Sequence, residues 1–137
     1  MNKQRFLDAI ERLKTDKSMT FDMDTGIAYI PKNIIYGPFT DQTLEAAIED
    51  PCGTTCCIAG DAVIQMYREG MCDTSESLFA NAETWFDITH EQAISLFYSC
   101  QWPPTLECRY EKAKTQKGRR SAAAAAIKYF MGKWKYV

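Results

Sequence analysis

The most apolar helical pattern of the chain runs from about residue 55 to residue 69. Its polar side chains recur at the spacing of one helical stripe: Asp61, Gln65, Arg68 and Glu69. The remaining positions are apolar or small, and one neighbouring element cannot cover an apolar arc this wide. We therefore predict a central, buried helix over residues 55–69, which begins at an N-cap of Thr54 or Thr55 and ends at Gly70.

Helical periodicity or helix caps recur on both sides of this stretch. The further predicted helices cover residues 3–15, a segment from Thr40 or Asp41 to Pro51, a segment capped at Asp73 to Ser75, a segment opened by a capping box of Thr89 and Gln92, a segment from Pro104 or Thr105, and residues 121–131. Alternating residues 19–24 and a turn signal at residues 24–26 are compatible with a short β-hairpin near residues 19–30, followed by a loop over residues 31–40. The prediction is a mainly α, compact single domain over residues 1–137, with about six helices packed around the central helix.

Two adjacent cysteines at the start of the central helix are predicted to differ. At about 100° per residue, Cys56 lies near the centre of the buried face, whereas Cys57 lies at the edge of the polar stripe and is expected to reach solvent. Ala59 and Gly60 follow, and Gly lowers helix propensity by about 1 kcal/mol relative to Ala. Small residues at this place predict the close approach of another backbone.

The same stretch resembles a known sequence motif, Cys-Gly-Thr-x-x-Cys-Ile-Ala-Gly. The matching positions are Cys52, Gly53, Thr54, Cys57, Ile58, Ala59 and Gly60, with Phe21-Asp22-Met23 before them and Leu96-Phe97 and Trp102-Pro103 after them. This pattern resembles an uncharacterised family of small bacterial and phage proteins, which usually has Trp where this chain has Asp61. Relative to that pattern, residues 26–50 resemble an insertion. The resemblance implies a shared fold and a phage-related role in host interaction, but no particular chemistry.

Charge is divided unevenly along the chain. Residues 1–108 contain seven Lys and Arg against 17 Asp and Glu, whereas residues 109–137 contain nine against one, so a net charge of −2 hides segments of −10 and +8. The second segment is a predicted basic C-terminal helix and tail, with residues 132–137 expected to fray. Such a division indicates either packing of the basic segment on the protein's own acidic body or a basic binding surface.

Composition also limits the compartment and the metal chemistry. The N-terminal residues lack the apolar core of a signal peptide, and no apolar run approaches the roughly 20 residues of a membrane span, so we expect a cytoplasmic protein without a membrane partner. The six cysteines are then expected to be free thiols. With His90 as the single histidine and no Cys-x-x-Cys pair, the spacings fit no zinc template, and neither a metal nor a cofactor is predicted.

The first candidate site is a thiol. Cys57 is expected in the first turn of a helix, where the helix dipole lowers a thiol pKa, and Cys52 is close enough in sequence to exchange with it. His90 is the only imidazole available as a base. The pattern therefore leaves three readings open: cysteine catalysis by Cys57 and His90, a regulatory thiol pair of Cys52 and Cys57, or inert packing.

The second candidate site is basic. Lys117, Arg119, Arg120 and Ser121 surround a glycine at the predicted start of the last helix, where free N–H groups favour an anionic ligand. The alternative is a solvated basic helix end that pairs with acidic residues of the protein itself. Aromatic residues among the cations of this segment also leave open the stacking of nucleobases.

These patterns favour a protein that works by binding rather than by catalysis. We expect it to inhibit or sequester a host protein or a small anionic ligand. The first alternative is a cysteine-dependent hydrolase or transferase that uses Cys57 and His90. The second is a nucleic-acid-binding protein that acts through residues 109–137.

Overall fold

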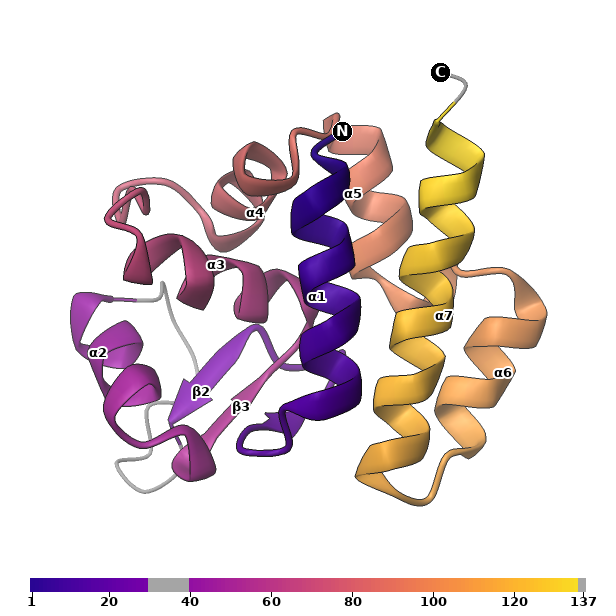
Figure 1. The fold of residues 1–137 in the computed structure, drawn as a ribbon, viewed down its shortest axis with the longest axis horizontal. Helices are drawn as coiled ribbons and strands as arrows, with labels where there is room; N and C mark the ends of the chain where they lie inside the picture. The colour runs from indigo at the N-terminus through magenta and orange to yellow at the C-terminus, as the bar shows by residue number, and fades with distance from the viewer. Residues whose placement is uncertain (30–39, 136–137) are drawn as a thin grey trace.

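Seven α-helices and three short strands are formed by residues 1–29 and 40–135, the part of the chain that this computed structural model describes (Figure 1). The helices are α1 (Lys3–Thr15), α2 (Asp41–Glu49), α3 (Ile58–Arg68), α4 (Leu78–Phe86), α5 (His90–Phe97), α6 (Pro104–Lys112) and α7 (Gln116–Trp134), with short 3₁₀ turns at Pro51–Gly53 and Ser99–Gln101. The prediction of a mainly α, compact single domain is confirmed. Apart from Thr40, the loop predicted over residues 31–40 lies outside the described residues.

Helix α3 is the central buried helix that the sequence predicts. Seven of its residues are buried, and α2, α4 and α1 pack around it. Gly60 is required here, because a Cβ atom at this position would lie 1.9 Å from the carbonyl oxygen of Gly26. The predicted close approach of another backbone is thereby confirmed.

The start of α3 differs from the prediction. The helix begins at Ile58 rather than at residue 55, because residues Thr54–Cys56 form strand β3. Cys57, and neither Thr54 nor Thr55, is the N-cap, and its Sγ accepts a hydrogen bond from the N–H of Gly60 at 3.4 Å. Two consecutive threonines suit a strand, since β-branched side chains fit a pleated surface.

Strand β3 also changes the expected hairpin. Strands β1 (Thr20–Phe21) and β2 (Ile27–Tyr29) do not pair with each other but lie on either side of β3 in the order β1-β3-β2. Strand β1 runs parallel to β3, and β2 runs antiparallel to it. A turn is present over residues 22–25 rather than 24–26. The strand that separates its two arms comes from a distant part of the chain, which local alternation cannot reveal.

Helices α1 and α7 run side by side in opposite directions, as Figure 1 shows. Near one end, the ring of Phe6 stacks on Phe86 with centroids 4.2 Å apart and also contacts Trp134. The alanine run of α7 is buried, so small side chains allow the two helices to pack closely. Because Trp134 is buried in α7, the expectation that the chain frays from residue 132 is wrong up to this residue; residues 136–137 lie outside the described part.

The start of α7 is a second correction. Thr115 is its N-cap and accepts a hydrogen bond from the N–H of Gly118 at 3.0 Å, so the helix begins at Gln116 rather than at residue 121. Residues 115–118 were expected to form a loop, with the free N–H groups of the helix start at residue 121, but residues 116–120 already belong to the first turns of the helix. Their side chains therefore project at helical spacing, so only some of them lie on the same face of α7.

The other caps agree with the sequence in part. The capping box of Thr89 and Gln92 is confirmed at α5, and Thr40 caps α2. Helix α4 is capped by Ser77 rather than within residues 73–75, where Asp73 instead accepts hydrogen bonds from Ser75. Among the described helices, none combines the length and the apolar character that a bilayer-spanning helix requires.

Candidate anion-binding groove

A groove with a volume of about 520 Å³ opens between α1, α7 and the segment that connects α1 to β1. Six basic side chains line it: Lys14, Lys17, Arg109, Lys117, Arg120 and Lys128. Among the described residues that line it, none is acidic and none is aromatic. Its lining therefore combines basic side chains with the apolar side chains of Leu13, Met19, Ala124 and Ala125.

Helical spacing explains how α7 supplies its share of this lining. Lys117, Ser121, Ala124 and Lys128 follow one another at intervals of three or four residues, so they lie on one face of the helix. Helix α1 runs antiparallel to α7, and its last turn brings Lys14 next to Lys128. The groove thus combines cations that are more than 100 residues apart in sequence.

Apart from Arg120, which lies near the carboxylate of Asp16, the cations of the groove are not balanced by acidic residues of the protein. Within the described part of the chain, no cation of the groove forms an ion pair; the salt bridges found there join Met1 to Asp87, Arg12 to Asp61 and His90 to Glu83. A hydrogen bond with the Lys14 side chain, and then repulsion by its like charge, lower the pKa of Lys128. Packing of residues 109–134 on the acidic body through ion pairs is thereby excluded for the residues that the structure describes.

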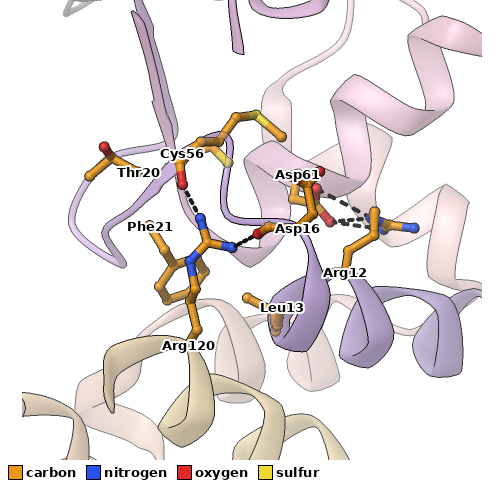
Figure 2. Close-up of a pocket in the computed structure, with 9 residues that line it drawn as sticks. Arg12, Leu13, Asp16, Thr20, Phe21, Cys56, Asp61 and Arg120 are labelled. Atoms are coloured by element: carbon orange, nitrogen blue, oxygen red, sulfur yellow. Dashed lines mark hydrogen bonds and ion pairs between the residues drawn. The ribbon is translucent and has the colours of Figure 1, made fainter. Parts of the chain in front are cut away.

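Arg120 has a structural role that the sequence did not predict. It is only 8% exposed, and its guanidinium donates hydrogen bonds to the carbonyl oxygens of Asp16 and Met19 (Figure 2). These two residues belong to the segment that forms one wall of the groove. The expectation of an exposed, ligand-binding Arg120 is therefore wrong for its guanidinium, which fastens that wall to α7.

Gln116 fastens the same wall at its other end. Its side-chain amide accepts a hydrogen bond from the N–H of Phe21 at 2.8 Å and donates one to the carbonyl oxygen of Phe21 at 3.3 Å. The amide thereby satisfies the backbone of β1 on the edge that faces away from β3. Arg120 and Gln116 thus hold the segment from α1 to β1 against α7, and the exposed lysines of the groove take no part in this contact.

Of the other residues predicted for this site, the structure places Lys117 and Ser121 in the groove and leaves Arg119 outside its lining. The hydroxyl Oγ of Ser121 accepts a hydrogen bond from Nη2 of Arg109 at 2.5 Å, which fixes Arg109 over the groove. Sequence reasoning missed Lys14, Lys17, Arg109 and Lys128. Lys14 and Lys17 belong to residues 1–108, whose net charge is −10, so the charge of each segment gave no sign of them.

The thiol site is arranged differently from the prediction. Cys57 is only 2% exposed, and burial raises the pKa of its thiol to about 11. The expectation that Cys57 reaches solvent is wrong, because its side chain turns inward to cap α3. Cys52 is exposed in the preceding turn, and Cys56 is buried as predicted, with a pKa raised by burial.

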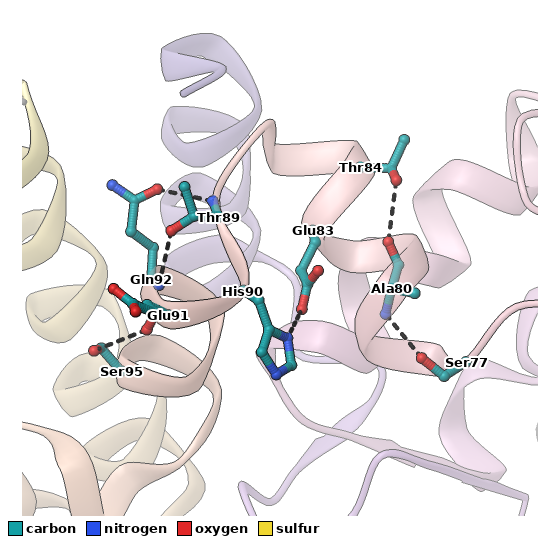
Figure 3. A network of polar contacts seen from close by, with 9 residues as sticks. All are labelled: Ser77, Ala80, Glu83, Thr84, Thr89, His90, Glu91, Gln92 and Ser95. Carbon is teal, nitrogen blue, oxygen red and sulfur yellow. Dashed lines mark hydrogen bonds and ion pairs between the residues drawn. The ribbon is translucent and has the colours of Figure 1, made fainter.

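His90 lies at the first position of α5, and its side chain is exposed. Its Nδ1 is 2.7 Å from Oε1 of Glu83 in α4 (Figure 3). Among the described residues, no hydrogen bond joins His90 to Cys57, whose Sγ faces Gly60 instead. A nucleophile and a base within hydrogen-bond reach are thus not formed by these two residues.

Residues 1–29 and 40–135 contain no group of three or more His, Cys, Asp and Glu side chains arranged to hold a metal ion. No protein-family model matches the chain, and neither a curated protein nor a solved structure does so. The resemblance to a family of phage and bacterial proteins stays a prediction.

Proposed function

We propose that this protein is a binding protein that captures an anionic ligand in the groove between α1 and α7. The observation that carries the proposal is the lining: five basic side chains besides the buried Arg120, no acidic one, and a volume of about 520 Å³. Bringing unpaired like charges together is unfavourable unless an opposite charge joins them. Sequestering a small anionic ligand, one of the roles expected from the sequence, needs only such a groove.

The composition of the groove favours binding over catalysis. Apart from the cations, its polar side chains are Ser18, Thr20, Gln116 and Ser121, and Gln116 and Ser121 already have partners within the protein. A general base or an activated thiol is not among them. The alternative enzyme with Cys57 and His90 is not favoured, because the thiol is buried with a raised pKa and each side chain has a different partner.

The apolar part of the lining also speaks against a single-stranded nucleic acid as ligand. Proteins that bind single strands stack bases on aromatic side chains, with about 1–3 kcal/mol per base. The described aromatic residues of the basic segment lie outside the groove lining: Tyr110, Phe130 and Trp134 are buried, and Tyr129 is exposed on α7 but does not line the groove. A small anion needs no stacking partner, so it agrees better with this lining.

The proposal is tested by calorimetric titration with inorganic pyrophosphate at low ionic strength. The wild-type protein is compared with a variant carrying Lys14→Ala and Lys128→Ala, which removes one groove cation from each helix. Lys3→Ala with Lys133→Ala is the matched control, because it removes the same charge from exposed positions of the same two helices outside the groove.

We expect pyrophosphate to bind the wild type and the control alike, and the groove variant to bind at least about tenfold more weakly, since each cation that contacts a phosphate adds a charge-assisted hydrogen bond. Absence of binding by the wild type would contradict the proposal. Equal loss of affinity in the two double variants would also contradict it, because attraction by net charge alone would then explain the binding.

A further inference from the structure

We propose that the ligand of the groove is a small, elongated molecule with an anionic group at each end and a less polar middle. This inference rests on the proposed function and narrows it to one class of ligand. It follows from how the cations and the uncharged residues are distributed along α7.

Along α7, the cations that face the groove form two groups, while Lys17 lines the groove from the segment that connects α1 to β1. At one end, Lys117 lies in the first turn of α7. Arg109 of α6 is held beside the next turn of α7 by its hydrogen bond to Ser121. At the other end, Lys128 lies beside Lys14 of α1. At about 1.5 Å per residue, the two ends are separated by roughly 10–16 Å along the helix axis, measured from Ser121 or from Lys117 to Lys128. A ligand that uses both groups must therefore span this distance, less the reach of the lysine and arginine side chains.

The stretch between the two ends is aliphatic. Ala124 and Ala125 face the groove there, opposite Leu13 and Met19, which come from α1 and the connecting segment. Arg120 also lines this part, but its guanidinium is directed to the carbonyl oxygens of Asp16 and Met19. Apart from Lys17, which also lines the groove from the connecting segment, the middle of the ligand therefore meets methyl and methylene groups.

The dimensions indicate a small molecule. A volume of about 520 Å³ lies within the range of roughly 300–1,000 Å³ that is typical of pockets for small ligands. A continuous phosphate chain, as in a nucleic acid, would instead favour cations spread evenly along its path. The grouping of cations at the two ends of α7's exposed face, with alanines between them, fits two separated anionic groups better.

The test uses alkane chains with a phosphate at both ends, in the butane, octane and dodecane lengths, and octyl phosphate as the ligand with one phosphate. Binding of each is measured by calorimetry to the wild type, to Lys14→Ala with Lys128→Ala, and to Arg109→Ala with Lys117→Ala. Lys3→Ala with Lys133→Ala again serves as the control. A short single-stranded RNA is titrated under the same conditions.

We expect octane bisphosphate to bind at least about tenfold more tightly than octyl phosphate and than butane bisphosphate, because engaging the second end becomes intramolecular once the first is bound. Removing the cations at either end should reduce the affinity for octane bisphosphate to that for octyl phosphate. The control should bind both ligands as the wild type does.

Equal affinity for octyl phosphate and octane bisphosphate would overturn the inference but leave anion binding in the groove standing. RNA that binds more tightly than every bisphosphate, and loses its affinity in both groove variants, would also overturn it and indicate a nucleic acid as ligand. If neither pyrophosphate nor any phosphorylated alkane binds, the proposed function fails together with the inference.

Discussion

The start of α3 and the groove beside α7 both concentrate polar groups, but they differ in whether those groups have partners. At the start of α3, the thiol of Cys57 accepts a hydrogen bond from Gly60, and the carboxylate of Asp61 is paired with Arg12 at 2.8 Å (Figure 2). In the groove, Lys14 and Lys128 face each other, and no described acidic residue neutralises either of them. The polar groups of the first region have partners within the fold, whereas the lysines of the second do not, which is why we propose that they bind a ligand.

Arg120 belongs to the groove by position but resembles the first region in having internal partners. It lines the groove, yet its guanidinium is buried and has partners, as the polar groups at the start of α3 do. A basic residue in a basic segment is therefore not evidence of a binding role by itself. The presence or absence of internal partners separates the residues that should change stability from those that should change binding.

The largest effect is expected at Gly60. In Gly60→Ala, the new Cβ would lie 1.9 Å from the carbonyl oxygen of Gly26, so the turn before β2 or the start of α3 must move. We expect the free energy of unfolding to fall by at least about 3 kcal/mol, at or above the upper end for overpacked sites. Urea denaturation followed by circular dichroism measures this loss.

Gly132→Ala is the control for that substitution. Gly132 is exposed in α7, and a Cβ there meets no other group within 4 Å. We expect a gain of up to about 1 kcal/mol from helix propensity. If Gly60→Ala were as harmless as Gly132→Ala, the close packing of α3 on the turn at Gly26 would be wrong.

Arg120→Ala should have the next largest effect. It leaves the carbonyl oxygens of Asp16 and Met19 without their charged donor, and we expect a loss of about 2–3 kcal/mol in the free energy of unfolding. The neighbouring Arg119 is half-buried, but within the described part of the chain its side chain forms no hydrogen bond or ion pair, so Arg119→Ala should cost less, at most about 1 kcal/mol. Equal losses in the two variants would contradict the structural role of Arg120.

The two adjacent cysteines should respond differently to serine. Cys56→Ser places a hydroxyl in an apolar, buried site, and we expect a loss of about 1–3 kcal/mol. Cys57→Ser should cost less, because a serine hydroxyl is a good N-cap and can accept the hydrogen bond from Gly60. Thermal melting of both variants tests the order, and a larger loss for Cys57→Ser would show that its N-cap role is minor.

A smaller effect of the buried thiol is expected above pH 9. Burial raises the pKa of Cys57 from 9.0 to about 11, so the unfolded chain loses this proton first and the folded state loses stability as pH rises between these values. We expect the difference in unfolding free energy between wild type and Cys57→Ser to shift by about 1 kcal/mol against the wild type from pH 8 to pH 10. Parallel pH profiles would mean that the thiol is accessible in the folded state.

The sequence predicts the helices well where local signals are complete. The stripe of Asp61, Gln65 and Arg68 locates α3, and the capping box at Thr89 locates the start of α5. The sequence does not predict contacts between segments that are distant along the chain. Strand β3 lies between β1 and β2, and no local pattern carries that pairing.

The groove could be predicted only in part for the same reason. Lys117 and Ser121 were expected from the basic segment, and both line it. Lys14 and Lys17 reach the groove because α1 packs antiparallel to α7, which is a tertiary contact. The burial of Arg120 likewise depends on carbonyl oxygens that lie about 100 residues away in sequence.

The measurement that tests the central claim most directly is the melting temperature of wild type and of Lys14→Ala with Lys128→Ala, each with and without pyrophosphate at low ionic strength. Without the anion, the variant should melt at the same temperature as the wild type or higher, because it loses a repulsion and no ion pair. With the anion, the wild type should gain stability by mass action and the variant should gain much less. If instead the variant melts well below the wild type without any anion, as Arg120→Ala is expected to do, the lysines serve the fold and the groove is not a binding site.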